Sequence, residues 1–186
     1  MVDRGLSAMA RALRPRTRRP KAGGAERAGV WRSARSEAAW ERLAEAQVDA
    51  RLLARRLVVS QAKTDPGAVA FDILRTRLLK VCRDNGWRRV AITSPTKGMG
   101  KSVICANLAF ALARSDETRA VLLDLDLRLP GLTRIFGPRA PRPIAALLRG
   151  EVAPEQFLQR IGRVVAVGVN GAPVRDSSEL LQSAST

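Results

Sequence analysis

Three stretches of the chain differ in how their apolar residues are spaced. Residues 1–29 are rich in arginine, alanine, glycine and proline and offer few apolar side chains to bury. That composition predicts a disordered basic arm. From residue 31 to residue 59 apolar side chains recur with the period of a helix that has one buried face. The sequence thus predicts a helical extension and linker over residues 30–64, with an apolar stripe formed by Trp40, Leu43, Ala46, Ala50, Leu53 and Leu57.

A helix, a strand and another helix are predicted in the third stretch, which begins at a turn over residues 63–67. Helical periodicity continues over residues 68–82. Residues 89–93 are a short β-branched, apolar run, which is typical of a buried parallel strand. Pro95 ends that strand because proline cannot donate to a sheet. A helix of small and apolar residues is expected from Lys101 onward.

Further strands and short helices are expected beyond this helix. Residues 120–126 predict a second buried strand and residues 163–169 a third. A strand–helix–strand unit of this size takes a right-handed crossover, which makes the two strands parallel. The predicted fold class is therefore α/β: a parallel sheet flanked by helices, with a basic, partly disordered and helical N-terminal extension. The short helices are expected over residues 132–136, 144–148 and 154–159, and a last one begins at Ser178.

Residues 94–103 have the composition of a phosphate-binding loop. Gly98 and Gly100 let the backbone approach a ligand, and the next helix directs its positive end to the same point. Lys101 would reach the β- and γ-phosphates, and the Ser102 hydroxyl would ligate Mg²⁺. A glycine-containing turn is the alternative, because Pro95 stands where the strict motif has glycine. The expected nucleotide-binding residues are Thr96, Lys97, Gly98, Met99, Gly100, Lys101, Ser102 and Val103.

Two aspartates end the second predicted strand. Asp124 and Asp126 stand two positions apart, so they project to one face of a strand, at the edge where parallel sheets bind ligands. Beside a bound Mg²⁺ they would serve the metal, or one would orient or deprotonate the attacking group. The alternative is a pair of solvated acids at a strand end. The catalytic candidates are Lys101, Asp124 and Asp126, and the metal candidates are Ser102, Asp124 and Asp126.

Composition excludes several classes of function. Histidine is absent, which excludes histidine-based acid–base catalysis, and the two cysteines have no metal-site or disulfide spacing.

The net charge is +16, and residues 1–63 hold 15 Lys and Arg against 6 acids. Such charge permits contact with polyanions, but no aromatic residue stands among the first 29 to stack on bases, which disfavours nucleic acid as a partner. No apolar run approaches the ~18 residues of a membrane span, and the N-terminus lacks a secretory signal, so a cytoplasmic protein is expected.

Several segments in the same order resemble the bacterial tyrosine kinases that regulate capsule and exopolysaccharide export. The loop T-S-P-T-K-G-M-G-K-S resembles their P-loop, and V-L-L-D-L-D-L-R-L-P resembles their second carboxylate motif. F-D-I-L-R-T-R-L and G-A-P-V-R-D-S-S-E-L-L are similar to the flanking segments, so the resemblance covers residues 65–183. It implies a MinD/ParA-type P-loop fold, ATP and Mg²⁺ as cofactors, and phosphoryl transfer to tyrosine. Residues 65–186 would form the N-terminal portion of this nucleotide-binding domain.

The sequence departs from that family in four places. The chain stops before the family's later apolar strand that ends in Asp, so we expect the domain to be truncated at its C-terminal part, and residues 1–186 alone to be poorly soluble and nearly inactive. It contains no tyrosine, so it cannot phosphorylate itself on tyrosine. The family's ring-assembly motif E-x-x-R-x-x-R aligns with Val69, Asp72 and Arg75. Thr96 occupies the position of the lysine that MinD/ParA dimers use, and no such role passes to Lys97.

The resemblance therefore implies an ATP-dependent protein-tyrosine kinase or ATPase of exopolysaccharide export. Its expected partners are ATP, a membrane-bound polysaccharide export protein and a tyrosine-containing protein substrate, with a homo-oligomer left open. Its expected location is the cytoplasm, at the periphery of the inner membrane. The alternative function is a non-kinase partition or positioning ATPase that switches partner binding with nucleotide.

Overall fold

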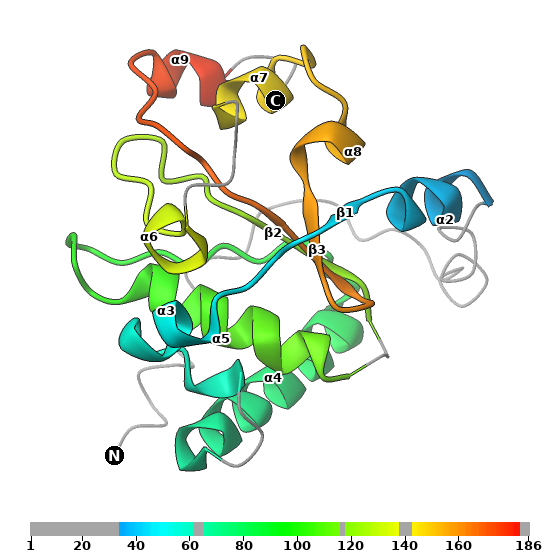
Figure 1. The fold of residues 1–186 in the computed structure, drawn as a ribbon, viewed down its shortest axis with the longest axis vertical. Coiled ribbons are helices and arrows are strands. Elements are labelled where there is room, and N and C mark those ends of the chain that lie inside the picture. Colours follow the sequence, from blue (N-terminus) through cyan, green and yellow to red (C-terminus); the bar gives the residue numbers. More distant parts are fainter. Residues whose placement is uncertain (1–33, 62–64, 116–117, 138–142, 183–186) are drawn as a thin grey trace. The chain divides into compact units, whose positions relative to one another are not determined.

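In a computed structural model of the chain, residues 34–61, 65–115, 118–137 and 143–182 are described. The chain forms two compact units, residues 1–37 and residues 38–186. The predicted disordered arm over residues 1–29 lies outside the described residues. The second unit carries the sheet, both long helices and the loop with the phosphate-binding pattern (Figure 1). No helix among the described residues is both long enough and apolar enough to span a bilayer.

The described strands form one sheet in the order β1-β3-β4-β2. β2 (Ala120–Leu123) pairs in parallel with β4 (Val165–Gly168). The parallel pair predicted between residues 89–93 and 120–126 does not form, because residues 89–93 form no strand. β3 (Gln159–Ile161) pairs antiparallel with β4, and β1 (Ala44–Glu45) pairs in parallel with β3. The sheet is therefore mixed: the predicted parallel component is present, and β3 adds an antiparallel strand to it. The reason lies between β3 and β4, where the turn around Gly162 is too short for a crossover and can only close a hairpin.

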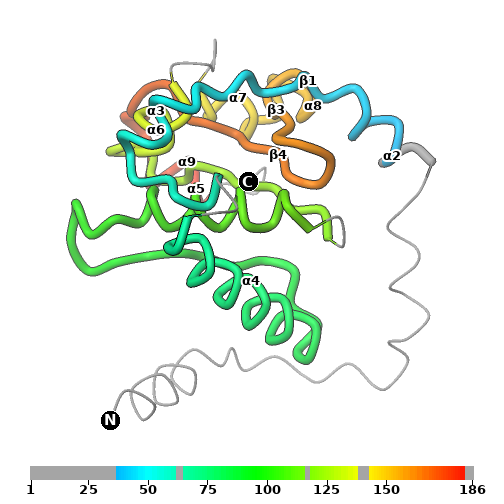
Figure 2. The backbone as a smooth tube through the Cα atoms, turned by 60° about the horizontal axis from the view of Figure 1, so that its bottom comes forward, coloured from blue at the N-terminus to red at the C-terminus, as the bar shows by residue number. Residues whose placement is uncertain are grey.

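Two long helices flank the loop, and their ends follow from local sequence. α4 (Pro66–Asn85) begins where Asp65 accepts a hydrogen bond from the Gly67 N–H at 2.8 Å, and it ends at Gly86 with φ +66°. α5 (Lys101–Ala113) begins after Gly100, at φ +84°, and no side chain caps its first turn. α5 lies between the sheet and α4 (Figure 2). Both helices were predicted from the sequence.

The predicted helical stripe of residues 31–59 is divided into shorter elements. α2 (Ala34–Glu41) and α3 (Ala50–Arg55) are separated by β1, and η2 (Val59–Gln61) follows. Asp49 restarts the helix by accepting hydrogen bonds from the backbone N–H groups of Arg51 and Leu52, so the earlier periodicity is lost. Leu53 remains buried, whereas Leu57 is 70% exposed, so the prediction of one continuous apolar face is wrong.

The shorter elements in the second half of the chain agree closely with expectation. α6 (Thr133–Phe136), α7 (Ile144–Leu148), α8 (Pro154–Phe157) and α9 (Ser177–Gln182) lie within a residue or two of the predicted helices. β2 ends at Leu123, before either aspartate, which is earlier than predicted. β3 was missed, because its residues follow α8 directly and the periodicity of that helix extends into them.

Residues 87–94 do not form the predicted strand. They belong to no helix or strand, and the side chain of Val90 is 51% exposed. A strand requires a neighbouring backbone, and among the described residues β2 pairs only with β4. The prediction of a buried strand over residues 89–93 is therefore wrong.

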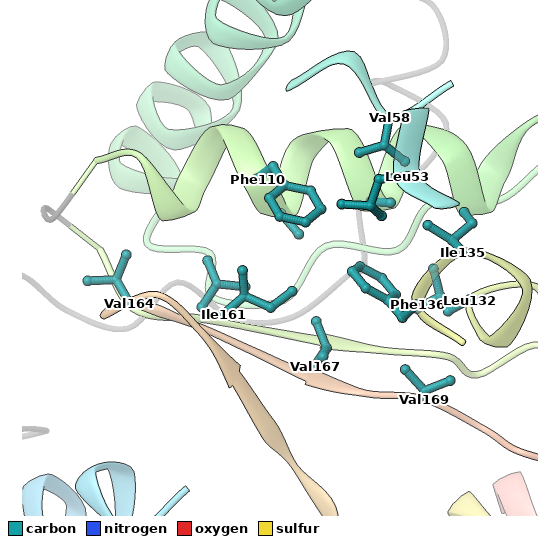
Figure 3. Close-up of a cluster of buried hydrophobic side chains, with 13 residues drawn as sticks. Leu53, Val58, Phe110, Leu132, Ile135, Phe136, Ile161, Val164, Val167 and Val169 are labelled. Carbon is teal, nitrogen blue, oxygen red and sulfur yellow. The ribbon is translucent and has the colours of Figure 1, made fainter. Parts of the chain in front are cut away.

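The main apolar core joins α5 to the sheet and to the segments that carry the loop. Phe110 of α5 stacks at 6.1 Å on Phe136 of α6, and Leu53 of α3 packs beside them with an exposed fraction of 0% (Figure 3). Val165 and Val167 of β4 belong to the same core. Burial of one such side chain stabilises the fold by roughly 1.5–3 kcal/mol. The start of α5 is thus fixed by contacts on the sheet side of the helix.

Candidate nucleotide-binding site

A cavity of about 660 Å³ lies at the start of α5. That volume falls in the ~300–1,000 Å³ range of small-molecule and cofactor sites. The backbone of the glycine loop, the start of α5, the loop after β2 and the helix α6 all contribute to it. Its lining residues are Arg56, Lys97, Gly98, Met99, Gly100, Lys101, Ser102, Val103, Asp126, Leu129, Gly131, Arg134 and Ile135.

The first turn of α5 is suited to an anion. Gly98 and Gly100 have φ of +78° and +84°, a backbone region that side chains disfavour, and this conformation brings the loop round to the helix end. No side chain caps the N-terminus of α5. Unsatisfied N–H groups and the positive end of the helix macrodipole therefore face the cavity.

Lys101 and Asp126 meet at one end of the cavity. The Lys101 ammonium donates a hydrogen bond to the Ser94 hydroxyl at 3.1 Å and lies 3.9 Å from the Asp126 carboxylate. Asp126 also accepts a hydrogen bond from the Leu129 N–H at 3.1 Å. Both charged side chains remain partly exposed, 27% for Lys101 and 40% for Asp126, so a ligand can reach them.

Asp124 occupies a different environment from Asp126. It is 6% exposed, and its carboxylate accepts hydrogen bonds from the N–H groups of Leu132 at 2.9 Å and Asp126 at 3.3 Å. Burial raises the pKa of Asp124, which the hydrogen bonds from Leu132, Asp126 and Gly131 oppose. Its carboxylate thus ties the loop after β2 to the end of that strand, and only Asp126 of the two lines the cavity.

Ser102 and Asp126 are the side chains best suited to Mg²⁺. Mg²⁺ takes oxygen ligands and commonly uses one or two protein groups with phosphate oxygens and water. The described residues contain no cluster of three or more His, Cys, Asp or Glu side chains that would form an all-protein metal site. Gly131 packs so closely that an added Cβ would lie 2.0 Å from the Ser102 hydroxyl oxygen. The residues present therefore fit a metal shared with a nucleotide, with Gly131 fixing the Ser102 hydroxyl.

Most of the sequence-predicted residues meet around this cavity. Residues 97–103 and Asp126 line it, whereas Thr96 and Asp124 do not. The sequence analysis missed Arg56, Leu129, Gly131, Arg134 and Ile135. The arginines carried no signal of their own, because they are two among many in an arginine-rich chain and are far from the loop in sequence.

Comparison with known proteins also indicates nucleotide binding. Residues 90–175 match the CobQ/CobB/MinD/ParA nucleotide binding domain. The chain is 35% identical over 114 residues to "Putative tyrosine-protein kinase EpsB" of Ralstonia solanacearum, a match that covers 61% of this chain and 15% of that protein. It is 41% identical over 66 residues to the succinoglycan biosynthesis transport protein ExoP of Rhizobium meliloti (strain 1021), covering 36% of this chain and 8% of ExoP.

A solved structure extends the likeness to the fold. The BceF tyrosine kinase domain superposes with a TM-score of 0.58 and 27% identity, covering 82% of this chain and 66% of that chain. The present chain corresponds to a small part of the curated relatives, 15% of EpsB. Residues 90–175 therefore resemble the CobQ/CobB/MinD/ParA nucleotide binding domain, and the chain is similar in sequence and fold to proteins named as bacterial tyrosine kinases.

Proposed function

We propose that the chain binds Mg-ATP in the cavity at the start of α5 and takes part in phosphoryl transfer to a protein tyrosine. The observation that carries this proposal is the convergence of Lys101, Ser102 and Asp126 on the uncapped N-terminus of a 13-residue helix. A helix N-terminus with an adjacent lysine binds phosphate, and a hydroxyl and a carboxylate beside it suit a divalent cation.

Each residue has a distinct part in this proposal. The N–H groups at the start of α5 and the Lys101 ammonium bind the phosphates, and Lys101 exchanges its contact with Asp126 for one with the nucleotide. Ser102 and Asp126 would hold Mg²⁺, which would neutralise negative charge on the phosphates. Asp126 would also accept a hydrogen bond from the acceptor hydroxyl. Asp124 holds the loop that presents Asp126.

The acceptor in this proposal lies outside residues 1–186. These residues contain no tyrosine, so another polypeptide segment supplies the acceptor hydroxyl. The names of two relatives refer to succinoglycan biosynthesis transport and to a tyrosine-protein kinase. We therefore propose a role in exopolysaccharide synthesis, at the periphery of the inner membrane, with a membrane-bound export protein as partner.

The experiment measures phosphotyrosine in a tyrosine-containing acceptor polypeptide. It uses the complete gene product that contains residues 1–186, as wild type and as Asp126→Asn. Groups that position or activate a nucleophile contribute roughly 10²–10⁴-fold to rate, so Asp126→Asn should lose about a hundredfold of transfer while still binding ATP. Asp84→Asn removes the same charge from the surface of α4 and should transfer at the wild-type rate.

Three outcomes separate the candidate functions. Phosphotyrosine that depends on Asp126 supports the kinase. ATP hydrolysis without transfer would instead support a positioning ATPase that switches partner binding. Equal transfer by wild type and Asp126→Asn would show that this carboxylate takes no part in the reaction.

A further inference from the structure

The cavity has a second set of cations that the P-loop pattern does not include. Arg56, at the C-terminal end of α3, and Arg134 of α6 line it together with Lys97 and Lys101. Asp126 is the one acidic residue in the lining, so the lining carries four cations against one carboxylate. Among the described residues neither arginine is paired with a carboxylate. Both guanidinium groups are therefore available to an anionic ligand.

The backbone at Arg56 is held by burial on both sides. Leu53 is 0% exposed and Val58 is 3% exposed, and both belong to the main core (Figure 3). α3 packs against α6, whose Ile135 lies in the same core. The two arginines thus come from neighbouring elements that are both packed on α5, although they are far apart in the sequence.

A strained turn follows Arg56 and is fastened to α5 itself. Leu57 has φ +59°, a left-handed conformation that costs a branched or bulky residue free energy, and its side chain is 70% exposed. The fully buried amide of Asn107 donates hydrogen bonds to the Leu57 carbonyl at 3.0 Å and to the Val103 carbonyl at 2.9 Å. Its oxygen accepts one from the Ser60 N–H at 2.9 Å. One side chain of the P-loop helix therefore fixes the turn that carries Arg56.

This arrangement brings an arginine from before α4 into the lining of the cavity that the phosphate-binding loop also lines. The loop and Lys101 provide contacts to phosphate that do not depend on how many phosphates the nucleotide has. Arg56 and Arg134 are additional to these contacts, and their role needs another explanation. Arginine forms paired, charge-assisted hydrogen bonds with phosphate oxygens. A triphosphate carries one more phosphate and more negative charge than a diphosphate, and extends further into the cavity.

We propose that Arg56, supported by Arg134, binds the outermost phosphate and makes the site prefer ATP to ADP. This inference rests on the proposed nucleotide site and adds to it a determinant of nucleotide specificity. Asn107 is a positioning residue for Arg56, because it acts through the backbone of the turn. The N-terminal segment that precedes the P-loop domain would thereby be part of the nucleotide site.

The test is calorimetric titration of Mg-ATP and Mg-ADP into wild type, Arg56→Gln and Arg134→Gln. A charge-assisted hydrogen bond is worth ~1.5–3 kcal/mol, or about tenfold or more in affinity. Arg56→Gln should therefore weaken ATP binding about tenfold and ADP binding less than about twofold. Arg134→Gln should change the ratio of the two affinities in the same direction.

Arg55→Gln is the matched control. Arg55 is the exposed neighbour on the same helix and does not line the cavity, yet its loss changes the net charge equally. An unchanged ATP-to-ADP ratio in Arg56→Gln, or an equal fall in Arg55→Gln, would overturn the inference. If neither nucleotide binds the wild type, the proposed function itself fails, so the two failures are distinct.

Discussion

One side of helix α5 is buried by apolar packing, and its other side contacts α4 through polar side chains. Towards the sheet, α3 and α6, it contributes Ala106, Ala109 and Phe110 to the main core. Towards α4 the described contacts include Asp72, whose carboxylate accepts hydrogen bonds from Arg75 at 3.1 Å and Arg114 at 2.6 Å. α4 has 20 residues, and Ala68 is its one buried residue.

This difference shows which part of the unit positions the nucleotide cavity. Arg134, Ile135 and Arg56 line the cavity and come from elements on the buried side. On the other side the exposed apolar side chains include Ile73 of α4 and Val90 of residues 87–94. The closely packed half of the unit therefore holds the site, and the half around α4 contributes little to it beyond the loop itself.

Shortening a buried side chain in the packed half should have the largest effect on stability. Leu53→Ala removes a fully buried side chain that touches α5 and α6, which costs ~2–5 kcal/mol. Val90→Ala, on the exposed segment, should change the free energy of unfolding by less than about 0.5 kcal/mol. Urea unfolding of the two variants measures the difference. Equal losses would show that the two sides of α5 are packed alike.

Removal of the Asn107 amide should have an intermediate effect. Asn107→Ala leaves the buried Ser60 N–H without its partner, which costs ~1–3 kcal/mol, and also removes the hydrogen bond to the Leu57 carbonyl. The same variant should lower the preference for ATP over ADP, since the turn that carries Arg56 is released. Unfolding and nucleotide titration on one preparation measure both. A loss of stability with an unchanged nucleotide preference would limit Asn107 to a structural role.

The polar contact between α4 and α5 should contribute least. Asp72 is 39% exposed, and pairs with that much solvent access are worth about 1 kcal/mol or less. Asp72→Asn keeps the shape and removes the charge, so its unfolding free energy should fall by no more than that and should become less dependent on salt. A loss comparable to that of Leu53→Ala would mean that the ionic contact, rather than apolar burial, determines how α4 is held.

Local chemistry explains why the elements around the loop could be predicted. The cap at Asp65, the left-handed Gly86 and the glycines before Lys101 act within a few residues, so they can be recognised without knowledge of the fold. The short helices from α6 to α9 follow similar signals. The P-loop and Asp126 were expected together because strand ends of parallel β–α units meet at one edge, and they do line one cavity although residues 89–93 form no strand.

Predictions that depended on distant partners were wrong or incomplete. Val90 has strand composition, but a strand forms only where another backbone pairs with it. Leu57 fits a helical stripe, yet Asp49 restarts the helix and leaves this side chain in solvent. Arg56 reaches the cavity only through the packing of α3 on α5 and α6, which the periodicity of the chain does not specify.

The central claim is that the loop before α5 binds nucleotide phosphate through Lys101. Calorimetric titration of Mg-ATP into wild type and Lys101→Ala tests it most directly, with Lys80→Ala, which removes the same charge from the exposed surface of α4, as the control. Loss of one charge-assisted contact of ~1.5–3 kcal/mol should weaken binding about tenfold or more, without change in the unfolding transition. Equal affinities for wild type and Lys101→Ala would contradict the assignment of the site.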